Sequence, residues 1–303
     1  MDKTIYNCIR VEYPDIPFFP AEENQMKVPA AWLIEQAGWK GKRHIDVVDE
    51  TRWLERIDPE GTTIRAIVGA AHLEVPDLAD VLDAHQNAST RFRGIRDMLA
   101  AHPNEAIVDW EREPGLIRNP AWRDGYALLG KRGLAFDAWM YHHQLDEFGE
   151  LVRSHPETKV VLCHLATPIA IAGPYAGLGT QAAERARIAD EWKEAIASFA
   201  SISHVRFKVS ALLMPIIGLG AEHRDEPMSE QELVDRIGPL IEWAIDTIGI
   251  DRCMFGSNFP IDKVSIDYPT LISGLDALLS TRRDEEKARL FADTAREFYT
   301  IEG

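Results

Sequence analysis

The stretch RCMFGSNFP, Arg252–Pro260, combines an apolar run with an abrupt polar ending. Its first half is typical of a strand covered on both faces, and the Gly, Ser, Asn and Pro that follow break the strand. Enzymes built on parallel strands place catalytic side chains at such endings. The stretch therefore predicts one strand of a parallel α/β enzyme, and it puts the neutral amide of Asn258 at a position that suits a carboxylate.

Six further apolar runs precede this strand, with helix-like stretches between most of them. We expect strands in Lys42–Val48, Thr63–Leu73, Phe92–Leu99, Leu134–Met140, Lys159–Leu165 and Val205–Leu213. About seven βα units without a strong linker favour an α/β fold, a (β/α)8 TIM barrel, over two doubly wound domains. We expect a single domain over residues 1–303. Its first strand is missing or degenerate, because only Thr4–Val11 offers a strand-like run ahead of the others.

The chain is acidic overall, with a formal net charge of -16 from 49 acidic and 33 basic side chains. Such a surface repels phosphate backbones and anionic lipids, so we expect neither nucleic acid nor a membrane as partner. The three cysteines, Cys8, Cys163 and Cys253, show no motif spacing, which suits reduced thiols. The sequence shows no signal peptide and no apolar run of about 20 residues. We expect a cytoplasmic protein that acts on a small molecule, as a monomer or as a homo-oligomer.

Polar side chains gather at the carboxyl ends of the expected strands. Since these ends meet at one face of a barrel, we expect the site there. The set comprises His44, Asp46, His72, Arg96, Asp97, His142, His143, His164, Lys208, Ser210, Ser257 and Asn258. Structural roles remain open for several of them: a hydrogen bond inside the barrel (His44, His72), a cap on its rim (Arg96, Asp97) or a helix start (His142, His143).

Two of these residues, His164 and Lys208, interrupt runs of apolar residues. His164 follows the buried run VVLC and precedes the turn LATP, where an imidazole can bind a metal, orient a carbonyl or transfer protons. Lys208 lies in the strand VRFKVSA, and a lysine is rarely buried there without a partner. Its ammonium suits an anionic substrate group, and a lowered pKa would suit it to a Schiff base. The structural alternative is an ammonium that reaches solvent at the strand end.

Six segments in a matching order resemble one family. They are FRGIRDML, GLAFDAWMYHHQL, KVVLCHLATP, VRFKVSALL, RCMFGSNFPIDK and EEKARLFADTAREFYTI. Over residues 42–300 the chain resembles the lactonase-like branch of the amidohydrolase superfamily, also called amidohydrolase 2. The resemblance implies a (β/α)8-barrel hydrolase that opens lactones of sugar acids or of aromatic-degradation products, with a divalent metal in some members and without one in others.

The resemblance also implies roles for single residues. His164 corresponds to the strand-six histidine, and Asn258 to the strand-eight Asp that activates water. Arg96 corresponds to a strand-four arginine, whose guanidinium suits a substrate carboxylate. We expect catalysis from His164, Asn258 and Asp262, and substrate contacts from Arg96, Lys208, His72, His143, Ser210 and Lys263.

Two features depart from the family pattern. The family's first strand ends in an H-x-H pair that begins the metal site, and no H-x-H occurs in this chain. Only His164 and Asp46 remain as ligands, so we expect no tightly bound metal, or one weakly bound Zn or Mn ion. Asn258 cannot accept a proton as a carboxylate does, although it can orient water or donate to an oxyanion. Asp262 or Lys263, just beyond it, is the candidate for the missing acid/base or anion-binding role.

These features favour a hydrolase of a lactone or related cyclic ester with an anionic group. One alternative is a lyase, either a decarboxylase or a Schiff-base aldolase that uses Lys208. The other is a non-catalytic barrel that has lost its strand-one metal ligands.

Overall fold

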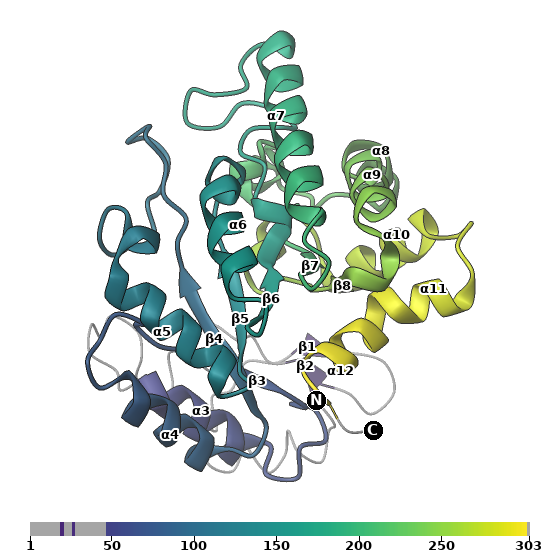
Figure 1. The fold of residues 1–303 in the computed structure, drawn as a ribbon. Helices are drawn as coiled ribbons and strands as arrows, with labels where there is room; N and C mark the ends of the chain where they lie inside the picture. Colours follow the sequence, from purple (N-terminus) through teal and green to yellow (C-terminus); the bar gives the residue numbers. More distant parts are fainter. Residues whose placement is uncertain (1–18, 21–25, 28–46, 302–303) are drawn as a thin grey trace.

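The computed structural model describes residues 19–20, 26–27 and 47–301, and its centre is a parallel sheet (Figure 1). In chain order the strands of this sheet are β3 (Ile67–Ala70), β4 (Phe92–Met98), β5 (Ala135–Trp139), β6 (Lys159–Leu162), β7 (Arg206–Val209) and β8 (Cys253–Phe255). Each strand pairs in parallel with the next one along the chain. All six carboxyl ends therefore meet at one edge of the sheet. A separate antiparallel pair is formed by β1 (Phe19–Pro20) and β2 (Met26–Lys27).

Helices connect the strands and cover the sheet. They are α3 (Val47–Ile57), α4 (Leu78–Ala88), α5 (Pro120–Lys131), α6 (Leu145–Ser154), α7 (Ala182–Ala200), α8 (Glu230–Arg236), α9 (Gly238–Ile248), α10 (Tyr268–Leu278), α11 (Asp284–Ala288) and α12 (Thr294–Phe298). In Figure 1, α3 to α6 lie to one side of the strands and α8 to α11 to the other. Helix α3 contacts α4, α6 contacts α7, and α8 contacts α10. No helix in the described part of the chain is long and apolar enough to span a bilayer.

The strands expected between residues 63 and 258 are confirmed, and with them the α/β class. The strand expected over Lys42–Val48 is wrong at its carboxyl end, because Val47 and Val48 begin α3. Two β-branched residues favour a strand locally, but Val48 and Thr51 lie on one buried helix face, and Asp49 and Glu50 suit the first turn of a helix. The remainder of that stretch, and the first strand expected over residues 4–11, lie outside the described residues.

Alternation along β5 separates two packing layers. Phe136 points outward, where its ring packs against Trp122 and Tyr126 of α5 and against Phe148 of α6. Ala135 points to the opposite face of the sheet and joins a separate, smaller cluster. This is the pattern of a strand buried on both faces, with helices outside and other strands inside.

The smaller cluster is the interior of the sheet. It contains Ala135, Val161 and Met254 from three strands, together with Phe298 and Tyr299 from the end of the chain. Phe298 is the last residue of α12 and Tyr299 follows it, and a π-helical turn over Arg289–Asp293 joins α12 to α11. Phe298 and Tyr299 therefore pack inside the barrel, against residues of three strands.

Candidate active site

The chain turns sharply where three strands end. His164, Ala211 and Asn258 follow β6, β7 and β8, and all three have positive φ, at 60°, 58° and 54°. Residues other than glycine seldom adopt this conformation, and such residues concentrate at functional sites. His164 begins a run of four such residues that ends at Thr167, so β6 ends at Leu162 rather than continuing to residue 165.

His164 lies between Arg96 and Ser210. Its Nε2 is 2.9 Å from an amino nitrogen of Arg96, and its Nδ1 is 2.8 Å from the hydroxyl oxygen of Ser210. A guanidinium has only donors, so Nε2 must be the acceptor and carries no proton. The proton is therefore on Nδ1, which donates to Ser210. The structure thus places three of the expected site residues in one chain of hydrogen bonds.

The surroundings of His164 keep its imidazole neutral. Burial and the positive charges of Arg96 and Lys208 hold the pKa of His164 well below its ordinary value of 6.5. A neutral imidazole whose Nε2 lone pair faces a cation is fixed in one tautomer and one orientation. It can hold Arg96 in place, but in this arrangement it cannot act as the acid form of a general acid.

Lys208 is paired with the carboxylate of Asp137, a residue that was not among the expected site residues. Its ammonium forms an ion pair with Asp137 of β5, a residue that is 1% exposed. Burial lowers the pKa of Lys208, but Asp137 outweighs that effect and the net pKa is raised. The Tyr299 hydroxyl donates to both oxygens of the same carboxylate, at 2.8 and 3.0 Å. Arg96, Asp137, His164 and Lys208 together form what we call the inner charge cluster.

Two tryptophans flank this cluster. Trp139, at the end of β5, lies under the Arg96 guanidinium at 5.6 Å from its ring centre and meets the His164 ring edge-on at 5.9 Å. Its indole nitrogen donates to Thr167, which fixes the ring. Trp110 packs on Trp139 with ring centres 5.4 Å apart and is 45% exposed. A continuous aromatic surface therefore leads from solvent to Arg96.

Asn258 and Asp262 form a second polar pair, beyond the end of β8. The Asn258 amide donates to Asp262 over 2.7 Å, and Asp262 is 2% exposed. Burial raises the pKa of Asp262 to about 7, although the hydrogen bond from Asn258 acts in the opposite direction. Asp262 thus exists at neutral pH as a mixture of acid and carboxylate, which suits a group that takes up and returns a proton.

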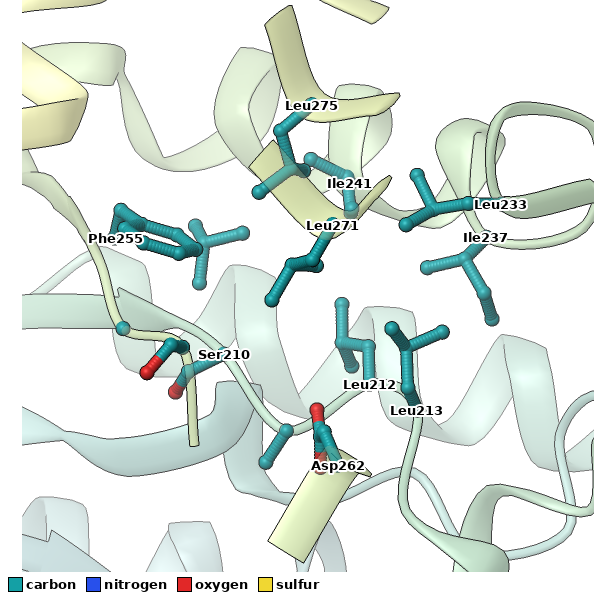
Figure 2. Close-up of a pocket in the computed structure, with 14 residues that line it drawn as sticks. Ser210, Leu212, Leu213, Leu233, Ile237, Ile241, Phe255, Asp262, Leu271 and Leu275 are labelled. Atoms are coloured by element: carbon teal, nitrogen blue, oxygen red, sulfur yellow. The ribbon is translucent and has the colours of Figure 1, made fainter. Parts of the chain in front are cut away.

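Asp262 and Ser210 line one pocket with a cavity volume of about 20 Å³, which is room for about one water molecule (Figure 2). Figure 2 shows Ser210 and Asp262 on the strand side and Leu233, Ile241 and Leu271 on the helix side. Since Ser210 also accepts from His164, it connects the inner charge cluster to the side of Asp262. Ser257, another residue expected at a strand end, also lines the pocket, and the remaining lining is apolar.

Other expected site residues lie outside the inner charge cluster. His72 is exposed beyond β3, and Lys263 is exposed beside Asp262. His143 is exposed at the start of α6, where its ring contacts His102 and Tyr141. Asp97 points away from Arg96, to Arg112 and Trp122, which supports the structural role that was left open for it. Asp46 and His44 lie outside the described residues.

Three residues of the site were missed from the sequence: Asp137, Trp139 and Tyr299. Asp137 and Trp139 stand in the quoted strand LAFDAWM, and a carboxylate in so apolar a run was a usable signal. Tyr299 had no such signal, because it is 162 residues away from Asp137 in the sequence.

The described residues do not fit a metal ion. They contain no group of three His, Cys, Asp or Glu side chains that could hold one. The Nε2 lone pair of His164 faces the Arg96 guanidinium, and a guanidinium repels a metal cation.

Comparison with known proteins agrees with this picture. The family profile described as amidohydrolase matches residues 47–301. The chain is 31% identical to the protein y4mH of Sinorhizobium fredii over 265 residues, which cover 85% of this chain and 80% of the relative. It is 24% identical to an L-fucono-1,5-lactonase of Burkholderia ambifaria, over 84% of this chain and 77% of the relative. A short match of 38 residues, 53% identical to a UDP-N-acetylenolpyruvoylglucosamine reductase of Porphyromonas gingivalis, covers 12% of this chain and 11% of the relative, too little to indicate a fold or an activity.

Among solved structures, an amidohydrolase from Burkholderia multivorans with bound zinc superimposes with a TM-score of 0.68. It is 23% identical and the match covers 84% of this chain and 80% of the neighbour, so it establishes the fold. The resemblance seen in the sequence motifs is confirmed, and the six parallel strands described above belong to a (β/α)8 barrel. The chain belongs to the amidohydrolase family and is an enzyme with that family's barrel fold.

Proposed function

We propose that this enzyme hydrolyses a lactone that carries an anionic group. The observation that carries the proposal is the Arg96 guanidinium, held between His164 and Trp139 where the strands end. The name of the L-fucono-1,5-lactonase relative supports the reaction type. The substrate would be an anionic sugar-acid lactone or an aromatic-degradation lactone.

Arg96 is the group that meets the substrate. A guanidinium can donate two parallel hydrogen bonds to a carboxylate, or stabilise the oxyanion that forms when water adds to the lactone carbonyl. His164 orients Arg96 from below through Nε2. Trp139 and Trp110 offer flat surfaces on which a ring packs. Lys208 is paired with Asp137, so in this proposal it supplies positive charge beneath the site rather than a direct substrate contact.

Asp262 is the proposed base. As the carboxylate, it would accept the proton of the attacking water, and as the acid it would return a proton to the leaving alkoxide. The Asn258 amide donates a hydrogen bond to the Asp262 carboxyl group, so the proposed role of Asn258 is to orient the base. The carboxylate missing from position 258 is then supplied four residues later.

We assign no step to a metal. The zinc belongs to a structural neighbour, and the donors within the described residues do not fit such an ion. The weak site expected from His164 and Asp46 stays a prediction, because Asp46 is not among the described residues. The single domain expected over residues 1–303 is likewise retained as a proposal, with the family match over residues 47–301 in its support.

The Schiff-base alternative requires a neutral amine at Lys208. The ion pair with Asp137 raises the pKa of Lys208 and keeps it as an ammonium, which disfavours this route. A decarboxylase remains the alternative lyase.

The test is hydrolysis by the purified protein of a panel of sugar-acid, pyrone and muconate-type lactones, with and without added zinc or manganese. We expect turnover of at least one anionic lactone, lost in Asp262→Asn and retained in Asp225→Asn, which changes an exposed carboxylate. Absence of turnover on every lactone by a correctly folded protein would refute the proposal. Release of CO2 from an aromatic carboxylate would establish the lyase alternative.

A further inference from the structure

The last structured turn of the chain makes a polar contact inside the barrel. Tyr299 lies one residue beyond α12 and is 7% exposed. Its hydroxyl spans both oxygens of Asp137, and its ring lies 5.3 Å from the Lys208 ammonium. The hydroxyl and the ring of one side chain therefore contact the two members of one ion pair.

The contact is directional. Burial, and then the adjacent Asp137 charge, raise the pKa of Tyr299 well above its ordinary value, so the phenol keeps its proton and acts as a donor. Besides Tyr299, Asp137 receives Lys208 and a long 4.0 Å contact from the Cys163 thiol. Without Tyr299, Lys208 would be the one strong donor among the described contacts of this carboxylate.

The ion pair lies beside the proposed substrate-binding residue Arg96. The Arg96 and Asp137 positions are partners in the pairing of β4 with β5. The charge of Lys208 acts on His164, whose Nε2 in turn accepts from Arg96. The position of Lys208 therefore affects the orientation of His164 and Arg96.

We propose that Tyr299 is a positioning residue of the active site: it fixes Asp137, Asp137 fixes Lys208, and Lys208 maintains the arrangement of His164 and Arg96. This proposal rests on the lactone hydrolysis proposed above. It gives the end of the chain a role in catalysis in addition to its packing. Phe298, the neighbouring residue of the same inner cluster, has no side-chain group that can do the same.

Tyr299→Phe removes the hydroxyl and keeps the ring. The matched control is Tyr126→Phe, because Tyr126 is fully buried and its hydroxyl has no hydrogen-bond partner among the described residues. We expect Tyr299→Phe to lower kcat about 10-fold with KM changed less than about twofold, and Tyr126→Phe to match the wild type.

A second measurement does not depend on turnover. The side-chain ¹⁵N signal of a lysine ammonium is observable when its protons exchange slowly, as in a fixed and buried ion pair. We expect this signal for Lys208 in the wild type, assigned by its loss in Lys208→Met, and its broadening or loss in Tyr299→Phe. If Tyr299→Phe does not fold, Tyr299→His, which keeps a ring N–H donor, replaces it and is expected to retain the signal and at least half of kcat.

The outcomes separate this proposal from the one it rests on. A changed Lys208 signal in a protein that hydrolyses no lactone would refute the proposed reaction and leave the fixing of Lys208 by Tyr299 supported. An unchanged signal in Tyr299→Phe, or loss of the signal in Tyr299→His, would overturn the positioning role, whatever kcat does, because Tyr299 would then not act on Lys208 as a hydrogen-bond donor. A changed signal with unchanged kcat would also overturn it, since the position of Lys208 would not matter to catalysis.

Discussion

Two buried carboxyl groups lie close to the ends of the strands, and their surroundings differ. Asp137 faces the Lys208 ammonium and the Tyr299 hydroxyl, inside the barrel. Asp262 faces the Asn258 amide and an apolar pocket, beyond the end of β8. They are 1% and 2% exposed, so burial is nearly the same for both.

The difference lies in the neighbouring charges. An ammonium compensates the charge of Asp137, and the result is a fixed ion pair suited to holding other groups. Burial outweighs the hydrogen bonds that Asp262 receives from the Asn258 side chain and the Leu213 backbone, so the pKa of Asp262 rises to about 7, which suits proton transfer. Burial alone therefore does not decide what a carboxyl group does in this enzyme.

The largest effect is expected at Asp137. Asp137→Asn leaves the Lys208 ammonium without its counter-charge in the barrel interior, and we expect the free energy of unfolding to fall by about 3 kcal/mol. Urea denaturation measures this loss. The double variant Asp137→Asn/Lys208→Met removes both charges and should recover more than half of it. A double variant no more stable than the single one would show that the ion pair is not the cause.

Substitution of Arg96 tests whether the inner charge cluster binds the substrate. Arg96→Lys keeps a positive charge but loses the planar fork, so we expect kcat/KM on an anionic lactone to fall about 30-fold, equivalent to roughly 2 kcal/mol. The control is Arg93→Lys, three residues earlier on β4. In the wild type the Arg93 guanidinium donates to backbone carbonyls. Equal losses in both variants would argue against a specific role for Arg96.

Because the pKa of Asp262 is raised in the folded protein, we expect Asp262 to make the protein less stable as the pH rises. Its pKa is about 7 in the folded protein and near 3.8 in the unfolded chain, so the folded state binds more protons between these values. The stability that Asp262 contributes is present below about pH 4 and is lost as the pH rises through 7. As the pH rises from 4.5 to 8, Asp262→Asn should therefore gain stability relative to the wild type, by about 3 kcal/mol.

Urea denaturation at the two pH values measures this difference, and Asp225→Asn, at an exposed position, is the control. A difference between Asp262→Asn and the wild type that stays constant with pH would show that Asp262 is charged throughout.

The smallest effect is expected at Trp110, at the outer end of the aromatic surface. Trp110→Ala removes one aromatic contact of Trp139 and leaves Arg96 in place, so we expect KM to rise about threefold at unchanged kcat. Tyr268→Ala, which removes a comparably exposed aromatic side chain at the start of α10, should leave KM unchanged. A fall in kcat in Trp110→Ala would instead place Trp110 in the chemistry.

Part of the site could be predicted because strand ends are a local pattern. Arg96, His164, Lys208 and Ser210 were all selected as polar interruptions of apolar runs, and the structure connects the four of them. His72 and His143 fit the same rule and lie outside the inner charge cluster, exposed to solvent. The direction of a side chain beyond the last residue of a strand depends on the turn that follows, which the pattern does not contain.

The sequence by itself determined the alternation of strands and helices, the parallel sheet and the family, because each depends on hydrophobic periodicity and on segments of about ten residues. The tertiary structure decided which charges are paired. Tyr299 and Asp137 meet because the end of the chain packs inside the barrel, and the raised pKa of Asp262 depends on burial by side chains from α8, α9 and α10. Burial and charge pairing are properties of the space around a residue, so they exist only once distant segments have come together.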